Sequence, residues 1–329
     1  MTSFHRAATG ASISARPDTD QEATTQVLGL RQAGGITPIQ GRVVSGRLGM
    51  SAGKWRLLLA LLGLIYYDIC WGVVVLERRF TYQPDPQHVA PGTARLTGVT
   101  ERILATPDGQ RLVAWQAKAK PGQPTLLYFH GNGNALIYRS GRIASFQAEG
   151  YGVLMIAYRG YSGSTGGPTE ANIVADARLA YDTLRGDGLK PEDIVIYGES
   201  LGTSVAVQTA IAKPARALIL EAPFTSMADA WKQFVPFLPV SLLLRDRFDS
   251  RSVIDRVRMP ILFMHGERDR LVGYQLGRSL YAAAPEPKRF EAFPEAGHTN
   301  LYDYNAIAAV RRFVDDVTSG TFKAGSAQP

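Results

Sequence analysis

Residues 194–206 read IVIYGESLGTSVA, and this stretch decides the fold. Its first four residues are apolar and predict a strand that is buried on both faces, while residues 203–212 continue without Gly or Pro, as a helix requires. Between them Gly198, Ser200 and Gly202 form the pattern G-x-S-x-G, in which the serine occupies a sharp turn from strand to helix and the glycines allow neighbouring elements to approach closely. We therefore expect the hydroxyl of Ser200 to lie at the edge of a sheet.

Strand and helix patterns alternate on both sides of this stretch. Two strand candidates, residues 102–106 and 112–117, are joined through Asp108-Gly109, a strong hairpin signal. Further strand candidates are residues 125–129, 153–158, 194–197, 217–220, 261–264 and 289–293, and helical segments are residues 135–149, 171–184, 201–212, 274–284 and 307–317. The sequence thus predicts an α/β fold, a mostly parallel sheet with helices on both faces, with ligand sites at the carboxyl ends of the strands.

The remaining segments predict the domain organisation. The 329-residue chain is expected to comprise a disordered segment (residues 1–54), a transmembrane helix (55–77), a linker (78–100), a catalytic domain (101–319) and a tail (320–329). Cys70 is the only cysteine, so no intrachain disulfide can form. The net charge of +7 is scattered, without a basic block interleaved with aromatics, and this pattern argues against a nucleic-acid partner.

Residues 57–76 form a 20-residue apolar stretch, long enough to cross a bilayer core of about 30 Å. Asp68 lies inside this stretch, so its carboxyl group must lie near the membrane interface, be protonated or pair with another helix. The alternative interpretation is a buried helix that packs on the domain. The positive charges before the stretch slightly outnumber those after it, which favours a single-pass protein with its catalytic domain outside the cytoplasm. They are Arg42, Arg47, Lys54 and Arg56, against Arg78, Arg79 and Arg95. Because Met50 directly precedes a signal-anchor pattern, the true start is either Met1 or Met50.

A serine nucleophile needs a base and an acid that orients the base. His298 follows the last strand candidate in a turn ahead of the final helix, where it can reach over the carboxyl edge of the sheet. Asp269 lies on the preceding loop of that edge, with Glu267 as its local competitor. The order Ser200, Asp269, His298 is the Ser, acid, His order of α/β-hydrolases.

An acyl-transfer site also needs backbone donors for an oxyanion. The N–H of Leu201, at the start of the helix after the serine, is one candidate, and the N–H of Asn132 in the His130–Asn134 loop HGNGN is the other, with Gly131 in reserve. This loop lacks the spacing of nucleotide-binding motifs, and no His/Cys/Asp/Glu cluster has zinc spacing, so neither a cofactor nor a metal is expected.

Three further features have open or structural interpretations. His130 and His265 each end a strand candidate and are expected to hold turns by side-chain to backbone hydrogen bonds. The glycine-rich loop of residues 158–167 either lines the pocket or is structural, with Arg159 paired to a carboxylate. Residues 234–244, FVPFLPVSLLL, could form an acyl-chain wall or a membrane-facing rim, with core packing as the alternative.

Together the motifs HGNGN, YRGYSGS, GESLG, EAPFTS, HGERD and AGH resemble the α/β-hydrolase superfamily over residues 81–317. The similarity is greatest to membrane-anchored, short-lid serine hydrolases of the abhydrolase-domain type, related to monoacylglycerol lipases, depalmitoylases and serine aminopeptidases. Gly273 departs from the proline that many relatives carry after the acid loop. The resemblance implies a serine hydrolase that cleaves esters or thioesters of lipid-like or acylated substrates; an amidase or aminopeptidase, or a tethered binding protein, are the alternatives.

Overall fold

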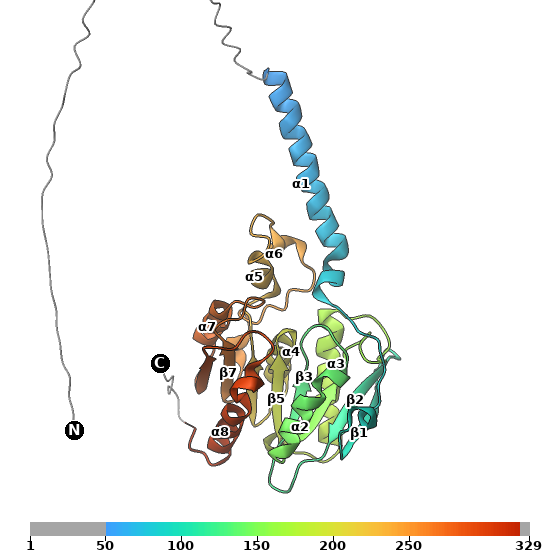
Figure 1. Ribbon diagram of the computed structural model, residues 1–329, viewed down its shortest axis with the longest axis vertical. Coiled ribbons are helices and arrows are strands. Elements are labelled where there is room, and N and C mark those ends of the chain that lie inside the picture. The colour runs from blue at the N-terminus through green and yellow to red at the C-terminus, as the bar shows by residue number, and fades with distance from the viewer. Residues whose placement is uncertain (1–50, 323–329) are drawn as a thin grey trace, which may run out of the picture. The chain divides into compact units, whose positions relative to one another are not determined.

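A computed structural model describes residues 51–322 of the chain, and from Lys54 onward these residues belong to one compact unit (Figure 1). The expected disorder of the N-terminal segment up to residue 50, the choice between Met1 and Met50, and the tail beyond residue 322 lie outside the described residues.

Within residues 51–322, eight strands form one sheet in the order β1-β2-β4-β3-β5-β6-β7-β8. The strands β1 and β2 form an antiparallel hairpin, β2 pairs antiparallel with β4, and all later pairs are parallel. Their bounds are β1 Val99–Ala105, β2 Arg111–Ala117, β3 Thr125–Phe129, β4 Gly152–Ile156, β5 Ile194–Glu199, β6 Ala217–Glu221, β7 Ile261–Gly266 and β8 Lys288–Phe293. The predicted parallel sheet with an antiparallel leading edge is therefore confirmed.

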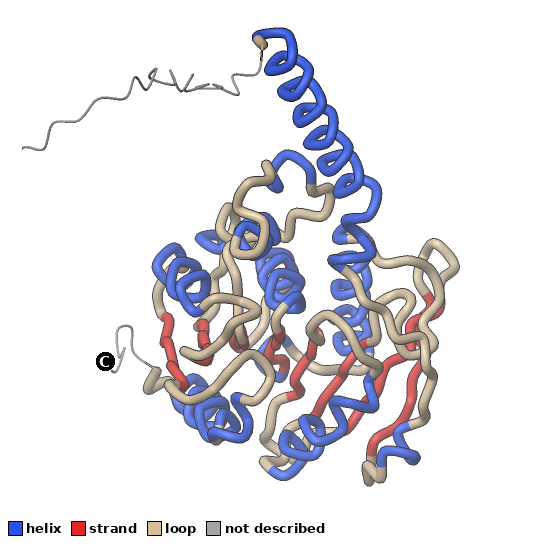
Figure 2. The backbone as a smooth tube through the Cα atoms, turned by 45° about the horizontal axis from the view of Figure 1, so that its top comes forward, coloured by secondary structure: helices blue, strands red, loops and turns tan. Residues whose placement is uncertain are grey.

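Helices cover both faces of this sheet, as Figure 2 shows. One face carries α2 and α8, and the other carries α3, α4 and α7. Their bounds are α2 Ser140–Ala148, α3 Glu170–Gly186, α4 Leu201–Ala212, α7 Tyr274–Ala283 and α8 Ala306–Thr318, and two short helices, α5 Met227–Lys232 and α6 Val240–Leu243, follow β6. Because helices lie on both sides, every residue of β3, β4, β6 and β7 is buried, which explains why these strands are nearly continuous apolar runs.

The first helix, α1, comprises Ala52–Thr81 and has 30 residues. It begins before and ends after the span expected at residues 55–77. Among the described residues it is the one helix that is long and apolar enough to cross a membrane. Its apolar 18-residue window has a mean hydropathy of 2.1, and none of that window is buried. The structure therefore does not show α1 as a helix buried against the domain.

The predicted linker after this helix is partly attached to the domain. Phe80 and Thr81 still belong to α1, Tyr82 is buried, and Pro91–Ala94 form a short 3₁₀ helix. The backbone N–H of Gln83 donates to Oδ1 of Asn132 over 2.8 Å, so the chain that leaves α1 contacts the HGNGN loop directly.

Candidate active site

Ser200 lies between β5 and α4 with backbone angles φ 51° and ψ −116°. Its N–H donates to the carbonyl of Glu221 in β6 over 2.8 Å, and its own carbonyl accepts from the N–H of Thr203 over 2.9 Å. A Cβ atom at Gly202 would lie 2.1 Å from the carbonyl oxygen of Phe129, so only glycine fits this approach of helix to strand. The local sequence thus produces the sharp turn that presents the serine side chain.

The three residues expected to act together are adjacent in the structure. Nε2 of His298 lies 2.9 Å from Oγ of Ser200, and Nδ1 of the same ring lies 2.7 Å from Oδ2 of Asp269. With the proton on Nδ1, His298 donates to the carboxylate and Nε2 can accept the hydroxyl proton of Ser200. Glu267, the local competitor for the acid position, is exposed, whereas Asp269 is buried.

The carboxylate of Asp269 is held by four donors. Its Oδ1 accepts the N–H groups of Leu271 and Val272 over 2.9 and 2.8 Å, and its Oδ2 accepts from both His298 and His265. Burial acts to raise the pKa of Asp269, but the hydrogen bonds from the two histidines and the charge of His298 outweigh it and hold this pKa well below its usual value. Asp269 is therefore an ionised, fixed acceptor for the imidazole.

The second histidine at this carboxylate could not be anticipated from the sequence. Nε2 of His265 lies 3.2 Å from Oδ2 of Asp269 and 2.9 Å from the carbonyl of Val272. The expected turn-holding contact is therefore present, and a contact with the acid is added to it. Gly277 in α7 packs directly against the ring, since a Cβ there would lie 2.2 Å from Nδ1.

The HGNGN loop lies against the serine. A Cβ on Gly131 would lie 3.2 Å from Cβ of Ser200, which places this backbone beside the nucleophile position. The side chain of Asn132 braces the loop, because its Oδ1 accepts from Gln83 N, Tyr161 Oη and Gly133 N over 2.8, 2.8 and 2.9 Å. The backbone of the HGNGN loop and the N-terminus of α4, which begins at Leu201, therefore both lie next to Ser200.

His130 has the structural role expected for it. Its Nδ1 contacts the carbonyl of Gly131 over 2.7 Å, and its Nε2 accepts the N–H of Tyr158. Burial first, and then the nearby charge of Arg139, lower the pKa of His130 to about 3, so its ring is neutral. Arg159 likewise matches the structural alternative, since its guanidinium pairs with Asp176 and Asp108.

Two arginine–glutamate pairs flank the serine turn. Glu199, directly before Ser200, accepts from Tyr128 and from Nε of Arg139 over 3.3 Å. Burial opposes its ionisation, but Arg139 and Arg142 outweigh burial and lower the pKa of Glu199 to about 2. Arg142 forms a bidentate pair with Glu221. Sequence reasoning missed both pairs, because they join residues about 60 and 79 positions apart.

We call residues 231–244, which lie between β6 and β7, the cap segment. Its Gln233 accepts the N–H of Gly273 through Oε1 over 3.0 Å, and this bond ties it to the loop that carries Asp269. Phe234, Phe237 and Leu242 within it are exposed. Apolar surface therefore lies close to the acid loop.

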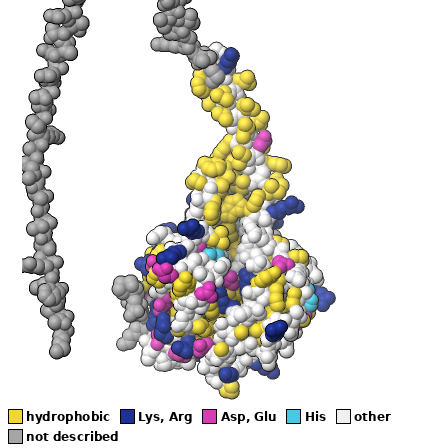
Figure 3. Space-filling view, in the orientation of Figure 1, with side chains coloured by type: hydrophobic (Ala, Val, Ile, Leu, Met, Phe, Trp, Pro, Cys, Tyr) yellow, Lys and Arg dark blue, Asp and Glu magenta, His cyan; other side chains and the backbone are white. Residues whose placement is uncertain are grey.

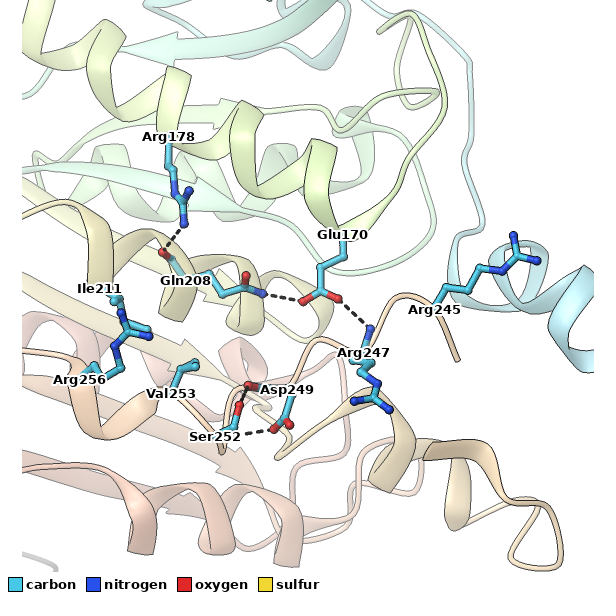
Figure 4. Close-up of a pocket in the computed structure, with 10 residues that line it drawn as sticks. All are labelled: Glu170, Arg178, Gln208, Ile211, Arg245, Arg247, Asp249, Ser252, Val253 and Arg256. Carbon is cyan, nitrogen blue, oxygen red and sulfur yellow. Dashed lines mark hydrogen bonds between the residues drawn. The ribbon is translucent and has the colours of Figure 1, made fainter. Parts of the chain in front are cut away.

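A hollow of about 360 Å³ lies on a different part of the domain, and none of its lining residues is Ser200, Asp269 or His298. Figure 4 shows four arginines around it, whose guanidinium groups point in different directions. The carboxylate near its centre, Glu170, accepts from Gln208 Nε2 and from the N–H of Arg247 over 2.8 and 2.7 Å. The charged side chains around this hollow do not point to a common position where one ligand could bind. Within residues 51–322, no group of three His, Cys, Asp or Glu side chains could hold a metal ion.

Comparison with known proteins agrees with this geometry. The profile described as "Alpha/beta hydrolase family" matches residues 126–265. The chain is 34% identical over 275 residues to the uncharacterized protein Rv2307c of Mycobacterium tuberculosis, covering 81% of this chain and 98% of the relative. It is 31% identical to the alpha/beta hydrolase domain-containing protein WAV2 of Arabidopsis thaliana, covering 70% of this chain and 83% of the relative.

Among solved structures, the Pyrococcus furiosus esterase Pf2001 matches with a TM-score of 0.59 and 18% identity, over 72% of this chain and 98% of that one. At this identity the likeness concerns the fold alone. The sequence relatives show more, and the chain belongs to the α/β-hydrolase family. The resemblance that the motifs indicated is thereby confirmed.

Proposed function

We propose that this α/β-hydrolase is a serine hydrolase that cleaves carboxylic esters or thioesters through an acyl-enzyme. The observation that carries the proposal is the hydrogen-bonded chain from Oγ of Ser200 through His298 to Asp269. In such a chain the imidazole removes the hydroxyl proton as the oxygen attacks a carbonyl carbon. Asp269 keeps the proton of His298 on Nδ1 and stabilises the imidazolium that forms.

In the first half-reaction, Ser200 and His298 account for every bond and proton that changes on the enzyme. The Ser200 Oγ–C bond forms, the proton passes to Nε2 of His298, and that proton then leaves with the alcohol or thiol as the bond to the leaving group breaks. In the second half-reaction water attacks the acyl carbon and gives a proton to His298. The Ser200 Oγ–C bond then breaks, the carboxylic acid leaves, and His298 returns the proton to Oγ. We assign the N–H groups of Asn132 and Leu201 to the oxyanion of both tetrahedral intermediates.

We further propose that the substrates are lipid-like acyl compounds or acylated proteins. The apolar helix α1 and the exposed apolar side chains of the cap segment support this choice over polar substrates. Four positive charges before the apolar stretch against three after it favour a catalytic domain outside the cytoplasm. A C-terminal alkaline phosphatase fusion expressed in bacteria should then be active, and an inactive fusion would reverse this orientation.

The proposal is tested with p-nitrophenyl esters and acyl thioesters of increasing chain length. Wild-type protein should hydrolyse them, and Ser200→Ala should lose turnover by about 10⁴-fold or more with an unchanged fold. Ser204→Ala is the matched control, because this buried serine lies one turn further along α4 and contacts Phe248 and Ser250 instead of the imidazole. Full turnover in the Ser200 variant would rule out the mechanism.

A further inference from the structure

The cap segment exposes three large apolar side chains within nine residues. Phe234, Phe237 and Leu242 have exposed fractions of 59%, 66% and 80%. No other stretch of this length in the described domain after α1 exposes three such side chains. Figure 3 shows apolar side chains covering α1 and the adjoining surface of the domain. Apolar surface that is concentrated in this way marks an interaction site.

The cap segment lies directly beside α1. The hydroxyl of Tyr66 donates to the carbonyl of Phe237 over 3.1 Å, and the rings of Phe80 and Trp231 meet edge to face at a centroid distance of 6.0 Å. These contacts link Trp231, at the start of the cap segment, and Phe237, in its middle, to positions fourteen residues apart on the helix. The segment therefore runs along α1 and does not merely touch its end.

Polar contacts fix this arrangement at the domain end of the helix. The buried carboxylate of Glu77 accepts the N–H of Arg245 over 2.6 Å. Asp246 accepts from Nε of Arg78 over 3.1 Å and from the hydroxyl of Tyr82 over 2.9 Å. Because Arg245 and Asp246 directly follow the cap segment, its position relative to α1 is set by ion pairing as well as by packing.

The position along the helix indicates what covers the cap segment. Tyr66 is ten residues before Leu76, the end of the apolar stretch, and at about 1.5 Å per residue this separation is about 15 Å. If the stretch crosses a bilayer core of about 30 Å, Phe237 lies at the depth of the hydrocarbon and not above it. A second protein copy or a soluble partner would have to share this depth with lipid.

The backbone of the cap segment suits an apolar medium. Six of its N–H groups donate to carbonyls inside the segment, and Pro236 and Pro239 have no N–H to satisfy. The six belong to Phe234, Val235, Leu238, Val240, Leu242 and Leu244. Each unsatisfied backbone polar group at membrane depth costs free energy, and these six internal bonds lower that cost for the cap segment.

We infer that the cap segment is a second membrane contact, whose side chains Phe234, Phe237 and Leu242 lie among the acyl chains of the bilayer that α1 crosses. The inference rests on the membrane span and the lipid-like substrates proposed above. Through the bond between Gln233 and Gly273, it places the acid loop of the candidate active site at the lipid surface. An acyl ester held in the bilayer would then reach Ser200 without passing through water.

The test uses single-cysteine variants of the full chain in a Cys70→Ser background. The fluorophore NBD is attached at Phe237→Cys, at Leu62→Cys as a probe of the span, and at Ile103→Cys as a control, because Ile103 is an exposed apolar residue of β1 on the hairpin at the other edge of the domain. Each protein is reconstituted in phosphatidylcholine vesicles. Quenching by 12-doxyl-phosphatidylcholine reports lipid contact, and quenching by iodide reports water.

We expect doxyl lipid to quench the 237 and 62 probes several-fold more than the 103 probe, and iodide to quench only the 103 probe. Iodide quenching at 237 equal to that at 103, with lipid quenching at 62 intact, would overturn the inference. A 237 probe shielded from both quenchers would overturn it in favour of a protein partner. Absence of lipid quenching at 62 would remove the span and the inference together. Leu242→Cys repeats the measurement if the 237 variant does not fold. Active-site labelling of Ser200 in the same samples reports the hydrolase proposal separately.

Discussion

Ser200 adopts a backbone conformation that its side chain disfavours. Its φ of 51° lies in the left-handed region, and such positions cost about 1 to 3 kcal/mol for residues other than glycine. The neighbouring contacts that enforce the angle are the bonds to Glu221 and Thr203 on either side of the turn. The surrounding contacts thus hold Ser200 in a strained conformation that presents its hydroxyl.

This strain leads to a prediction for two inactive variants. Ser200→Gly should be more stable than Ser200→Ala by about 1 kcal/mol, because glycine adopts positive φ without steric cost. Urea unfolding of both variants, followed by circular dichroism, measures the difference. An alanine variant as stable as the glycine variant would show that the turn is relaxed.

Glu199 makes the stability of the turn depend on pH. Its pKa in the folded protein is about 2, below the ordinary 4.5, so the ionised carboxylate stabilises the fold at pH values above about 4.5. This contribution is lost as the pH falls from about 4.5 towards 2, with a slope of up to about 1.4 kcal/mol per pH unit for this one proton. Asp269, whose pKa is also lowered, likewise contributes stability that is lost at acid pH.

The measurement compares the wild type with Glu199→Gln in urea at pH 7 and at pH 3. The variant should be less stable at pH 7, because Arg139 and Arg142 lose a charged partner, and its stability should change less between the two pH values. Comparison of the two proteins cancels the contributions of other carboxyl groups. Parallel pH profiles would show that Glu199 is not the group that titrates.

At the scale of elements, the turn depends on the approach of α4 to β3. A Cβ at Gly202 would lie 2.1 Å from the Phe129 carbonyl, whereas a Cβ at Gly141 in α2 meets nothing within 4 Å. Gly202→Ala should therefore cost about 3 kcal/mol or more, while Gly141→Ala should stabilise by about 0.5 to 1 kcal/mol through helix propensity. Thermal unfolding of both variants checks this contrast. A Gly202 variant as stable as the Gly141 variant would contradict the packing described here.

The elements themselves were largely predictable from the sequence. The strand predicted at residues 125–129 and the helix predicted at residues 201–212 have the same bounds as β3 and α4. Buried parallel strands are short apolar runs bounded by turn residues, and this pattern is local. The order of Ser200, Asp269 and His298 along the chain also follows from local patterns, because each residue ends or follows a recognisable strand.

The contacts that sequence reasoning missed depend on how the chain turns back on itself in three dimensions. His265 could be placed at the end of a strand, but its contact with Asp269 depends on how the following loop turns back. The Arg139–Glu199 and Arg142–Glu221 pairs form only when α2 packs on the sheet. Helix α1 extends to Thr81, and its last turns bond to residues 245 and 246. Such bonds join distant segments, and a single sequence carries no periodic signal for them.

At the scale of the whole molecule, the proposed membrane span of α1 leads to a prediction about where the α/β-hydrolase domain is held. We expect the full chain to remain in the membrane pellet after extraction with alkaline carbonate. Replacing Leu62 and Ile65 with lysine should release it, because each charge near the centre of a span costs about 3 kcal/mol. Both side chains are exposed on the helix, so the substitutions do not disturb the domain core. Retention of the double variant would contradict a membrane span.

The central claim is that Ser200 is an activated nucleophile, and covalent labelling tests it most directly. Purified full-length protein is treated with a fluorophosphonate probe, and the adduct is located by peptide mass mapping. We predict one adduct, on Ser200, formed at a rate that falls by several powers of ten in His298→Ala and is unaffected in Ser204→Ala. A folded protein that is not labelled, or labelling that does not depend on His298, would contradict the claim and leave a membrane-tethered binding protein as the better account.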